Sequence, residues 1–361
     1  MNKRRNNMVV AGCLLLALTG CGGQSRQPIG ASPATTTGLV PSGVPTEGVR
    51  PSADGLLPAA EPRSAPAQFN PLAGHIVAVG QAPEGVVVDA ATRTVAVATH
   101  HPDQLVLINA DTALVTAHVP LPGVVRHLAL AAPGGPVLVP VETANAVIRV
   151  ELPRGIASPP IITGTSPHDA TAAANGTVFV SNELGGTVAA VRGNDVVKAF
   201  TDCVQPAGMA AVANTVGMLD ARANDLTTYD AASLSIVGST PAGAGPTHLV
   251  ADRHGRMIAA DTRGDEVRVF AALPAPKQVG SVAQPDGPYG IAYDVARDRL
   301  WVASSGSNEV IGYDMSMSDP VQIQRFSTVQ NPYSLGVDSK TGRLYVAGVS
   351  GGVLQILDTA P

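Results

Sequence analysis

From residue 75 onward, hydrophobic residues lie in short runs separated by polar turns. Typical runs are Val95-Ala96-Val97-Ala98, Val178-Phe179-Val180 and Leu300-Trp301-Val302-Ala303. Turn-forming residues such as Ser339-Lys340-Thr341-Gly342 separate them. Short β-branched runs bounded by turn formers are typical of β-strands. The pattern therefore predicts an all-β domain.

This strand pattern repeats seven times. The first run of each unit starts at position 83, 125, 167, 206, 246, 288 or 332, so that one unit spans about 40 residues. Each unit holds three well-defined apolar runs and a more variable fourth. Four strands in a unit of this length make one propeller blade. The sequence predicts a seven-bladed β-propeller over residues 71–361.

The two ends of the repeat region are complementary. The last unit stops after its third run, Val353-Leu354-Gln355-Ile356-Leu357, and an unassigned strand, His75-Ile76-Val77-Ala78-Val79, precedes the first unit. We expect the N-terminal strand to complete the seventh blade, because closing the ring removes an exposed sheet edge.

The first 21 residues have the order of a secretion signal. A basic start, Lys3-Arg4-Arg5, precedes an apolar stretch from Met8 to Leu18, which is too short to span a bilayer. The stretch ends in Leu18-Thr19-Gly20-Cys21, which resembles the bacterial lipobox. The resemblance implies a signal peptide over 1–20, lipidation of Cys21 and an extracytoplasmic, lipid-anchored place at the cell membrane. An ordinary signal peptide with a chance cysteine is the alternative.

Residues 21–70 predict a linker that begins at the lipidated cysteine. Runs such as Pro33-Ala34-Thr35-Thr36-Thr37 and Pro41-Ser42-Gly43-Val44-Pro45 show neither strand nor helix periodicity. A Pro/Gly/Ser/Thr-rich segment of this kind buries too little apolar surface to offset its ordering entropy. We therefore expect a disordered tether between membrane and propeller.

The repeat units resemble the YVTN-type seven-bladed β-propellers over residues 75–361. Leu344-Tyr345-Val346-Ala347 and Leu300-Trp301-Val302-Ala303 match the second-strand signature of that family. The first-strand pattern matches at 83–89 and 288–294, whereas Val216-Gly217-Met218-Leu219 in blade four is the weakest match. The single tryptophan, Trp301, cannot supply the repeated tryptophans of quinoprotein-type blades.

Composition excludes some classes of protein. Only 14% of the residues are charged, which argues against long amphipathic helices. The net charge is −5 and no basic cluster lies beyond residue 5, so a nucleic-acid partner is disfavoured. Of the three cysteines, Cys203 alone would remain in the folded part, where we expect a small buried residue and no disulfide.

Polar residues occur at corresponding positions of several blades, where the first strands line the central channel. The predicted channel-face binding residues are Glu84, Arg126, His127, His168, Asp169, His248, Tyr289 and Tyr333. Adjoining loops add Glu142, Glu183, Arg222, Asp261, Arg263 and Asn308. These residues are scattered in the sequence, and the propeller fold is expected to bring them together.

His127, His168 and His248 with Asp169 form the sharpest of these groups. Imidazole and carboxylate suit a transition metal or general acid–base chemistry. However, blades two, three and five are not all neighbours, which would place the three imidazoles too far apart for one metal ion. A solvated polar channel is the favoured interpretation, with no metal ligand, no catalytic residue and no cofactor assigned.

The sequence favours a non-catalytic, membrane-anchored binding or scaffold module. Its ligand would be a small molecule, a cell-envelope component or a protein partner. The alternative is a lactonase- or lyase-like enzyme, because Thr262 to Phe270 resembles a segment of lactonase-type propellers. Arg263, His248 and Glu84 would then serve in oxyanion support and acid–base work. A metal-binding sensor that uses the channel histidines is the third hypothesis.

Overall fold

Seven antiparallel sheets form a closed ring in the computed structural model, which describes residues 52–67 and 71–359. The predicted seven-bladed β-propeller is confirmed. The predicted signal peptide and Cys21 lie outside the described residues. Within the described ranges, none of the helices has the length and apolar character needed to span a bilayer.

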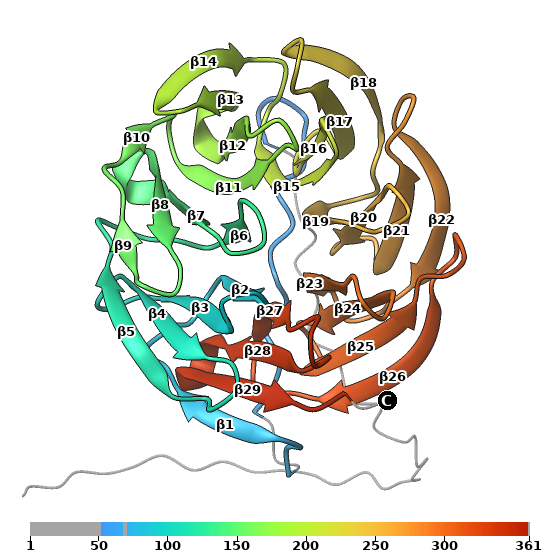
Figure 1. The fold of residues 1–361 in the computed structure, drawn as a ribbon. Coiled ribbons are helices and arrows are strands. Elements are labelled where there is room, and N and C mark those ends of the chain that lie inside the picture. Colours follow the sequence, from blue (N-terminus) through green and yellow to red (C-terminus); the bar gives the residue numbers. More distant parts are fainter. Residues whose placement is uncertain (1–51, 68–70, 360–361) are drawn as a thin grey trace, which may run out of the picture. The chain divides into compact units, whose positions relative to one another are not determined.

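Blades one to four each run from an innermost strand outwards (Figure 1). Their strands are β2 (Val86–Asp89), β3 (Thr94–Thr99), β4 (Gln104–Asn109) and β5 (Val115–Pro120); β6 (Ala129–Leu130), β7 (Val137–Val141), β8 (Ala146–Glu151), β9 (Ile156–Ala157) and β10 (Ile161–Ile162); β11 (Pro167–Ala172), β12 (Val178–Asn182), β13 (Thr187–Arg192) and β14 (Asp195–Phe200); and β15 (Pro206–Val212), β16 (Thr215–Asp220), β17 (Asp225–Asp230) and β18 (Ser235–Pro241).

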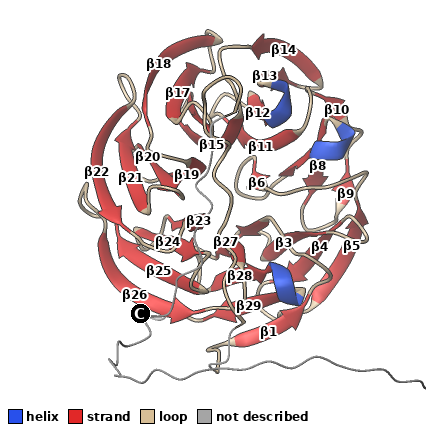
Figure 2. Ribbon diagram, turned by 180° about the vertical axis from the view of Figure 1, so that it is seen from behind, coloured by secondary structure: helices blue, strands red, loops and turns tan. Residues whose placement is uncertain are grey.

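Blades five to seven complete the ring. Their strands are β19 (Pro246–Ala251), β20 (Arg256–Asp261), β21 (Glu266–Ala271) and β22 (Lys277–Ala283); β23 (Pro288–Asp294), β24 (Arg299–Ser304), β25 (Glu309–Asp314) and β26 (Val321–Ser327); and β27 (Pro332–Val337), β28 (Leu344–Gly348), β29 (Val353–Leu357) and β1 (His75–Ala78). The described chain also contains three short 3₁₀ turns, η1 (Glu142–Ala144), η2 (Glu183–Gly185) and η3 (Val349–Gly351) (Figure 2).

The predicted ring closure is confirmed by β1. This strand pairs antiparallel with β29, from His75 opposite Ile356 to Ala78 opposite Val353. Gly74 makes the approach possible, because a Cβ there would lie 2.0 Å from the Ile356 carbonyl oxygen and its φ is +78°. The first and last strands of the propeller therefore belong to one sheet.

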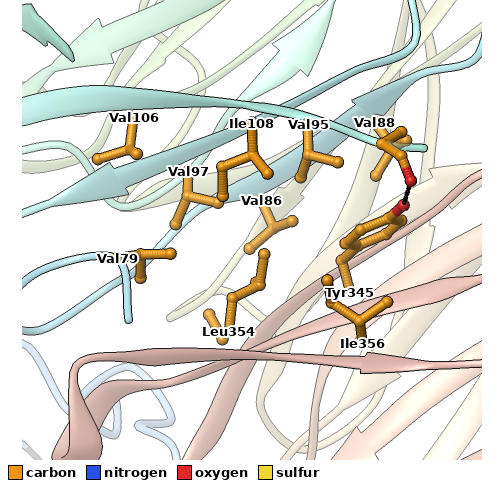
Figure 3. Packing of buried hydrophobic residues seen from close by; sticks show 12 residues of the cluster. Val79, Val86, Val88, Val95, Val97, Val106, Ile108, Tyr345, Leu354 and Ile356 are labelled. Carbon is orange, nitrogen blue, oxygen red and sulfur yellow. Dashed lines mark hydrogen bonds between the residues drawn. The ribbon is translucent and has the colours of Figure 1, made fainter. Parts of the chain in front are cut away.

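Apolar side chains fill the space between neighbouring blades. Figure 3 shows the interface of blades seven and one, where Val95 and Val97 of β3 face Leu354 and Ile356 of β29. Tyr345 of β28 is fully buried there, and its hydroxyl donates a hydrogen bond to the Ala110 carbonyl oxygen at 3.0 Å. The tyrosine thus packs with its ring and satisfies its polar end across the blade boundary.

Blade two departs from the predicted pattern. Its innermost strand β6 contains only Ala129–Leu130, although the repeat predicted a strand from Val125. Its outer edge is split into β9 and β10, which both pair with β8. Arg126 and His127 consequently lie on the loop that leads into β6, where the backbone is not tied to a sheet neighbour.

Part of the predicted tether lies on the propeller. We call residues 52–67 the strap; they fall inside the predicted 21–70 linker, and the structure describes their contacts. Both views place this segment across the centre of the ring (Figures 1 and 2). Ala60 and Ala65 of the strap are buried. The expectation of a disordered tether therefore does not hold for the strap, and for residues 21–51 it stays a prediction.

Cys203 is a free thiol at the border of the core of blades three and four. Burial, helped by the nearby Asp202 and Asp220, raises the pKa of this thiol to about 12. The side chain is half-buried, whereas the sequence predicted a small buried residue. A thiol with this pKa stays protonated and unreactive near neutral pH.

Candidate functional site

Five of the predicted channel residues form a continuous layer of rings, which we call the aromatic layer. In order, the rings are His168, His127, His248, Tyr289 and Tyr333, with centroid separations of 4.4, 4.4, 4.3 and 5.8 Å. The expectation that imidazoles from blades two, three and five stand far apart is therefore wrong. All innermost strands approach the propeller axis, so that blades distant around the ring come together at its centre.

Irregular register in the innermost strands places several polar side chains on the strap side of the aromatic layer. The pairing of innermost and second strands shifts after Pro167 in β11, after Pro246 in β19, after Pro288 in β23 and after Pro332 in β27. His168, Thr247, Tyr289 and Tyr333 directly follow these prolines. A bulge bends its strand and re-aims a side chain, which explains why the residue after the proline repeatedly lines the small space under the strap, as His168, Thr247 and Tyr289 do.

His168 is held between two carboxylates. Its Nδ1 lies 2.9 Å from Glu142 Oε1 and 3.2 Å from Glu183 Oε2. Burial alone would lower the pKa of His168, but hydrogen bonds and charge attraction from both glutamates outweigh it and raise the pKa to about 10. Burial would raise the pKa of Glu183, yet the His168 interaction brings it down to about 2. Without a bound metal, the group is an imidazolium paired with carboxylates.

His248 has the opposite environment. It is half-buried, with its ring centroid 4.4 Å from that of His127, and desolvation followed by repulsion from His127 and His168 lowers its pKa well below the usual value. Its Nδ1 contacts the Thr247 hydroxyl at 3.2 Å. Within the aromatic layer, His127 thus lies between His248, which is neutral, and His168, which is protonated.

Asp169 and Glu84 take different roles from one another. Asp169 accepts hydrogen bonds from the backbone N–H groups of Met209, at 2.8 Å, and Ala170, at 2.7 Å. The bond from Met209 ties blade three to blade four, so that the carboxylate is structural. His127 Nδ1 lies 3.7 Å from it. Glu84 lies on the loop before β2, with His100 Nε2 at 3.9 Å.

Two cavities meet at the aromatic layer. The larger is a channel of about 340 Å³, lined by residues of the innermost strands that include Leu128, Thr171 and Ile291. The smaller, of about 20 Å³, lies between the strap and His168. Arg126 and His248 line both. These two residues therefore separate the channel from the space under the strap.

Three of the predicted loop residues bind the strap. Arg222 forms an ion pair with Asp54 at 2.7 Å, Arg263 donates to the Pro58 carbonyl oxygen at 2.6 Å, and Asn308 donates to the Pro66 carbonyl oxygen at 2.8 Å. Arg263 is therefore occupied by the strap and does not join His248 and Glu84 in the group expected for the enzyme hypothesis.

The pairing of Glu142 and Glu183 around His168 was missed. Both residues follow the second strand of their blade, and they stand one repeat apart in the sequence. This equivalent position was a usable signal. Gln205, whose amide donates to Glu183 Oε1 at 2.8 Å, and Glu61 of the strap, 3.9 Å from Arg126, carried no comparable signal.

No protein-family model matches the chain, and no curated protein matches it in sequence. Its fold is similar to that of hydrazine synthase from Kuenenia stuttgartiensis, at 16% identity and a TM-score of 0.68, over 77% of this chain and 96% of that one. Virginiamycin B lyase from Staphylococcus aureus matches at 15% identity and a TM-score of 0.64, over 78% and 98%. A chain of the mitotic checkpoint complex matches at 12% identity and a TM-score of 0.69, over 84% and 97%. These likenesses show the propeller fold, which hosts many unrelated functions.

Proposed function

We propose that the propeller is a binding module whose ligand enters the central channel. The observation that carries this proposal is the cavity of about 340 Å³, which ends at His127, His248 and Arg126. A space of this volume is at the small end of ordinary ligand sites, and such sites combine apolar walls with a few polar groups. The strap contacts the other side of the aromatic layer, which leaves the channel side for the ligand.

The channel lining is more polar than apolar, which favours a small polar organic molecule with a limited apolar part. Leu128, Ile291 and Leu335 contribute aliphatic carbon to the channel. At its polar end, the neutral His248 and the ring of His127 offer hydrogen bonds. Glutamates surround Arg126, so an uncharged or cationic head fits better than an anionic one.

Filling the channel should remove the ligand. Thr171 is partly exposed and lines the cavity, so Thr171→Trp is expected to lower the amount of co-purifying small molecule at least about tenfold. The measurement is mass spectrometry of the small molecules released when protein isolated from its native cells is denatured. The control is Thr116→Trp, on the exposed outer strand β5. Equal small-molecule content in wild type and Thr171→Trp would contradict a channel site.

We further propose that Cys21 carries a lipid and anchors the chain to the extracytoplasmic side of the cell membrane. The Leu18-Thr19-Gly20-Cys21 sequence after an apolar stretch supports it. Each buried methylene of an acyl chain contributes about 0.8 kcal/mol to membrane binding. We expect Cys21→Ser to move the protein from the detergent phase to the aqueous phase in a two-phase partition, while Cys203→Ser stays in the detergent phase. Detergent partition of Cys21→Ser would refute the anchor.

A lyase-like activity is the second candidate. An imidazole between two carboxylates is chemically suited to general acid–base catalysis. However, the free space beside His168 is about 20 Å³ and lies under the strap, which leaves room for one water molecule but not for a substrate. The geometry therefore supports binding in the channel more strongly than catalysis at His168.

A further inference from the structure

Three ligand-type side chains converge on one point beneath the strap. One atom from each of Glu142, His168 and Glu183 lies within 4.8 Å of the others. The two oxygens stand 2.9 and 3.2 Å from His168 Nδ1. Two ligand atoms bound to a common ion at about 2.1 Å stand about 3.0–3.4 Å apart at octahedral or tetrahedral angles. Only small side-chain adjustments would therefore form a three-ligand site.

The charges around this group favour a cation. Glu142 and Glu183 approach the same nitrogen, and Glu61 and Glu84 also interact with the neighbouring Arg126. Glu142 Oε1 and Glu61 Oε2 lie 3.6 and 3.9 Å from nitrogens of the Arg126 guanidinium. Converging carboxylates repel one another unless a cation lies between them.

Two further features fit a bound ion. The cavity of about 20 Å³ is lined by His168, Glu183 and Glu61, and it has room for one water molecule as an additional ligand. Gln205 Nε2 donates to Glu183 Oε1, which leaves Glu183 Oε2 directed at His168. Such second hydrogen bonds commonly orient a ligating carboxylate. Glu61 is 70% exposed and does not count among the ligands.

We propose that Glu142, His168 and Glu183 bind one divalent transition-metal ion, enclosed between the aromatic layer and the strap. A mixed set of one imidazole nitrogen and two carboxylate oxygens suits zinc, manganese, iron or nickel. Magnesium and calcium prefer oxygen ligands alone. The site lies on the strap side of His248, so it neither requires nor excludes a ligand in the channel.

The test is a titration of the purified full chain with Zn²⁺, measured by calorimetry. A chelator first removes any metal that the protein carries, and the chelator is then removed. We expect one strongly bound Zn²⁺ per chain that is lost in Glu142→Gln and in Glu183→Gln, with a decrease in affinity of at least about 100-fold. Both variants keep the side-chain volume, and circular dichroism checks their fold. Gln205→Leu removes only the orienting bond and should weaken binding about 10- to 100-fold. Magnesium should not compete at equal concentration.

The matched control is His254→Asn. His254 also forms an imidazole–carboxylate pair, with Asp298 at 2.7 Å, but it lies on the surface. We expect this variant to bind Zn²⁺ like the wild type. The proposal is overturned if the wild type binds no Zn²⁺ at micromolar concentration, or if the folded Glu142→Gln and Glu183→Gln variants retain wild-type affinity. Loss of binding in His254→Asn alone would assign the ion to the surface pair and overturn it equally.

Discussion

A chain that begins at residue 80 is expected to lose most of the thermal stability of a chain that begins at residue 71. The two chains differ by the segment that contains β1, which closes blade seven. Without β1, the backbone of β29 becomes an unpaired edge, and Val79 no longer packs in the interface of blades seven and one. The ladder bonds at about 0.5–1.5 kcal/mol each, and Val79 at about 1.5–3 kcal/mol, together amount to several kcal/mol.

A loss of this size is a large part of the 5–15 kcal/mol that stabilises a typical domain. The measurement is a circular-dichroism melt of both chains, neither of which contains the strap. His75→Ala in the longer chain is the control, because the His75 side chain is exposed and its backbone pairing would persist. Equal melting midpoints for the chains that start at 71 and 80 would show that β1 does not close the ring.

The fold could be predicted because each blade is built from contacts between neighbouring strands. The repeat makes seven such units visible, and the missing fourth strand after Leu357 identifies β1. Blade two was less predictable, because its split outer edge and the short β6 interrupt the regular alternation. Local pattern therefore specified the blades, whereas irregular strand pairing escaped it.

The membership of the candidate site could be predicted, but not its pairings. His127 and His248 each lie two residues after the start of a repeat and both line the channel, whereas His168 lies one residue after its repeat start and lines the space under the strap. That Glu142 and Glu183 share His168 depends on the register shift in β11, although their equivalent positions after the second strands of adjacent blades were a usable signal. Whether the rings touch depends on how closely the strands approach the axis, which repeat length alone does not fix.

The strap escaped prediction for a different reason. Its composition is that of a tether. Most of its hydrogen bonds with the propeller are made by the strap backbone rather than by strap side chains. Arg222, Arg263 and Asn308 all bind strap atoms, and two of these three residues bind its backbone only. Backbone acceptors are present in every sequence, so composition cannot show that a segment will be held in this way.

Polar channel-face residues consequently fall into groups with separate tasks. Residues of the aromatic layer lie between the channel and the small space under the strap. Residues of the loops bind the strap over that small space. A third group acts within the blades, at the ends of second strands. Asp220 and Asp261 occupy this position in blades four and five, and both accept several backbone N–H bonds from the loop that enters their own blade.

Replacing Asp261 is therefore expected to affect folding more than binding. Its fully buried carboxylate accepts hydrogen bonds from the N–H groups of Ala244, Gly245 and Gly264, and it pairs with Arg268 Nε at 3.1 Å. Asp261→Ala would leave these donors and the guanidinium without their partner. Removing one member of such a buried charged network costs about 3–5 kcal/mol.

Urea unfolding monitored by fluorescence of the buried Trp301 gives the measurement. The control is Asp195→Ala, because Asp195 is an exposed aspartate on the outer strand β14, and we expect its effect to stay within about 0.5 kcal/mol. Asp220→Ala should resemble Asp261→Ala, because the same loop-binding position recurs one blade earlier. If Asp261→Ala unfolded at the same urea concentration as Asp195→Ala, the carboxylate would not stabilise its loop, and its place among the ligand-binding residues would have to be reconsidered.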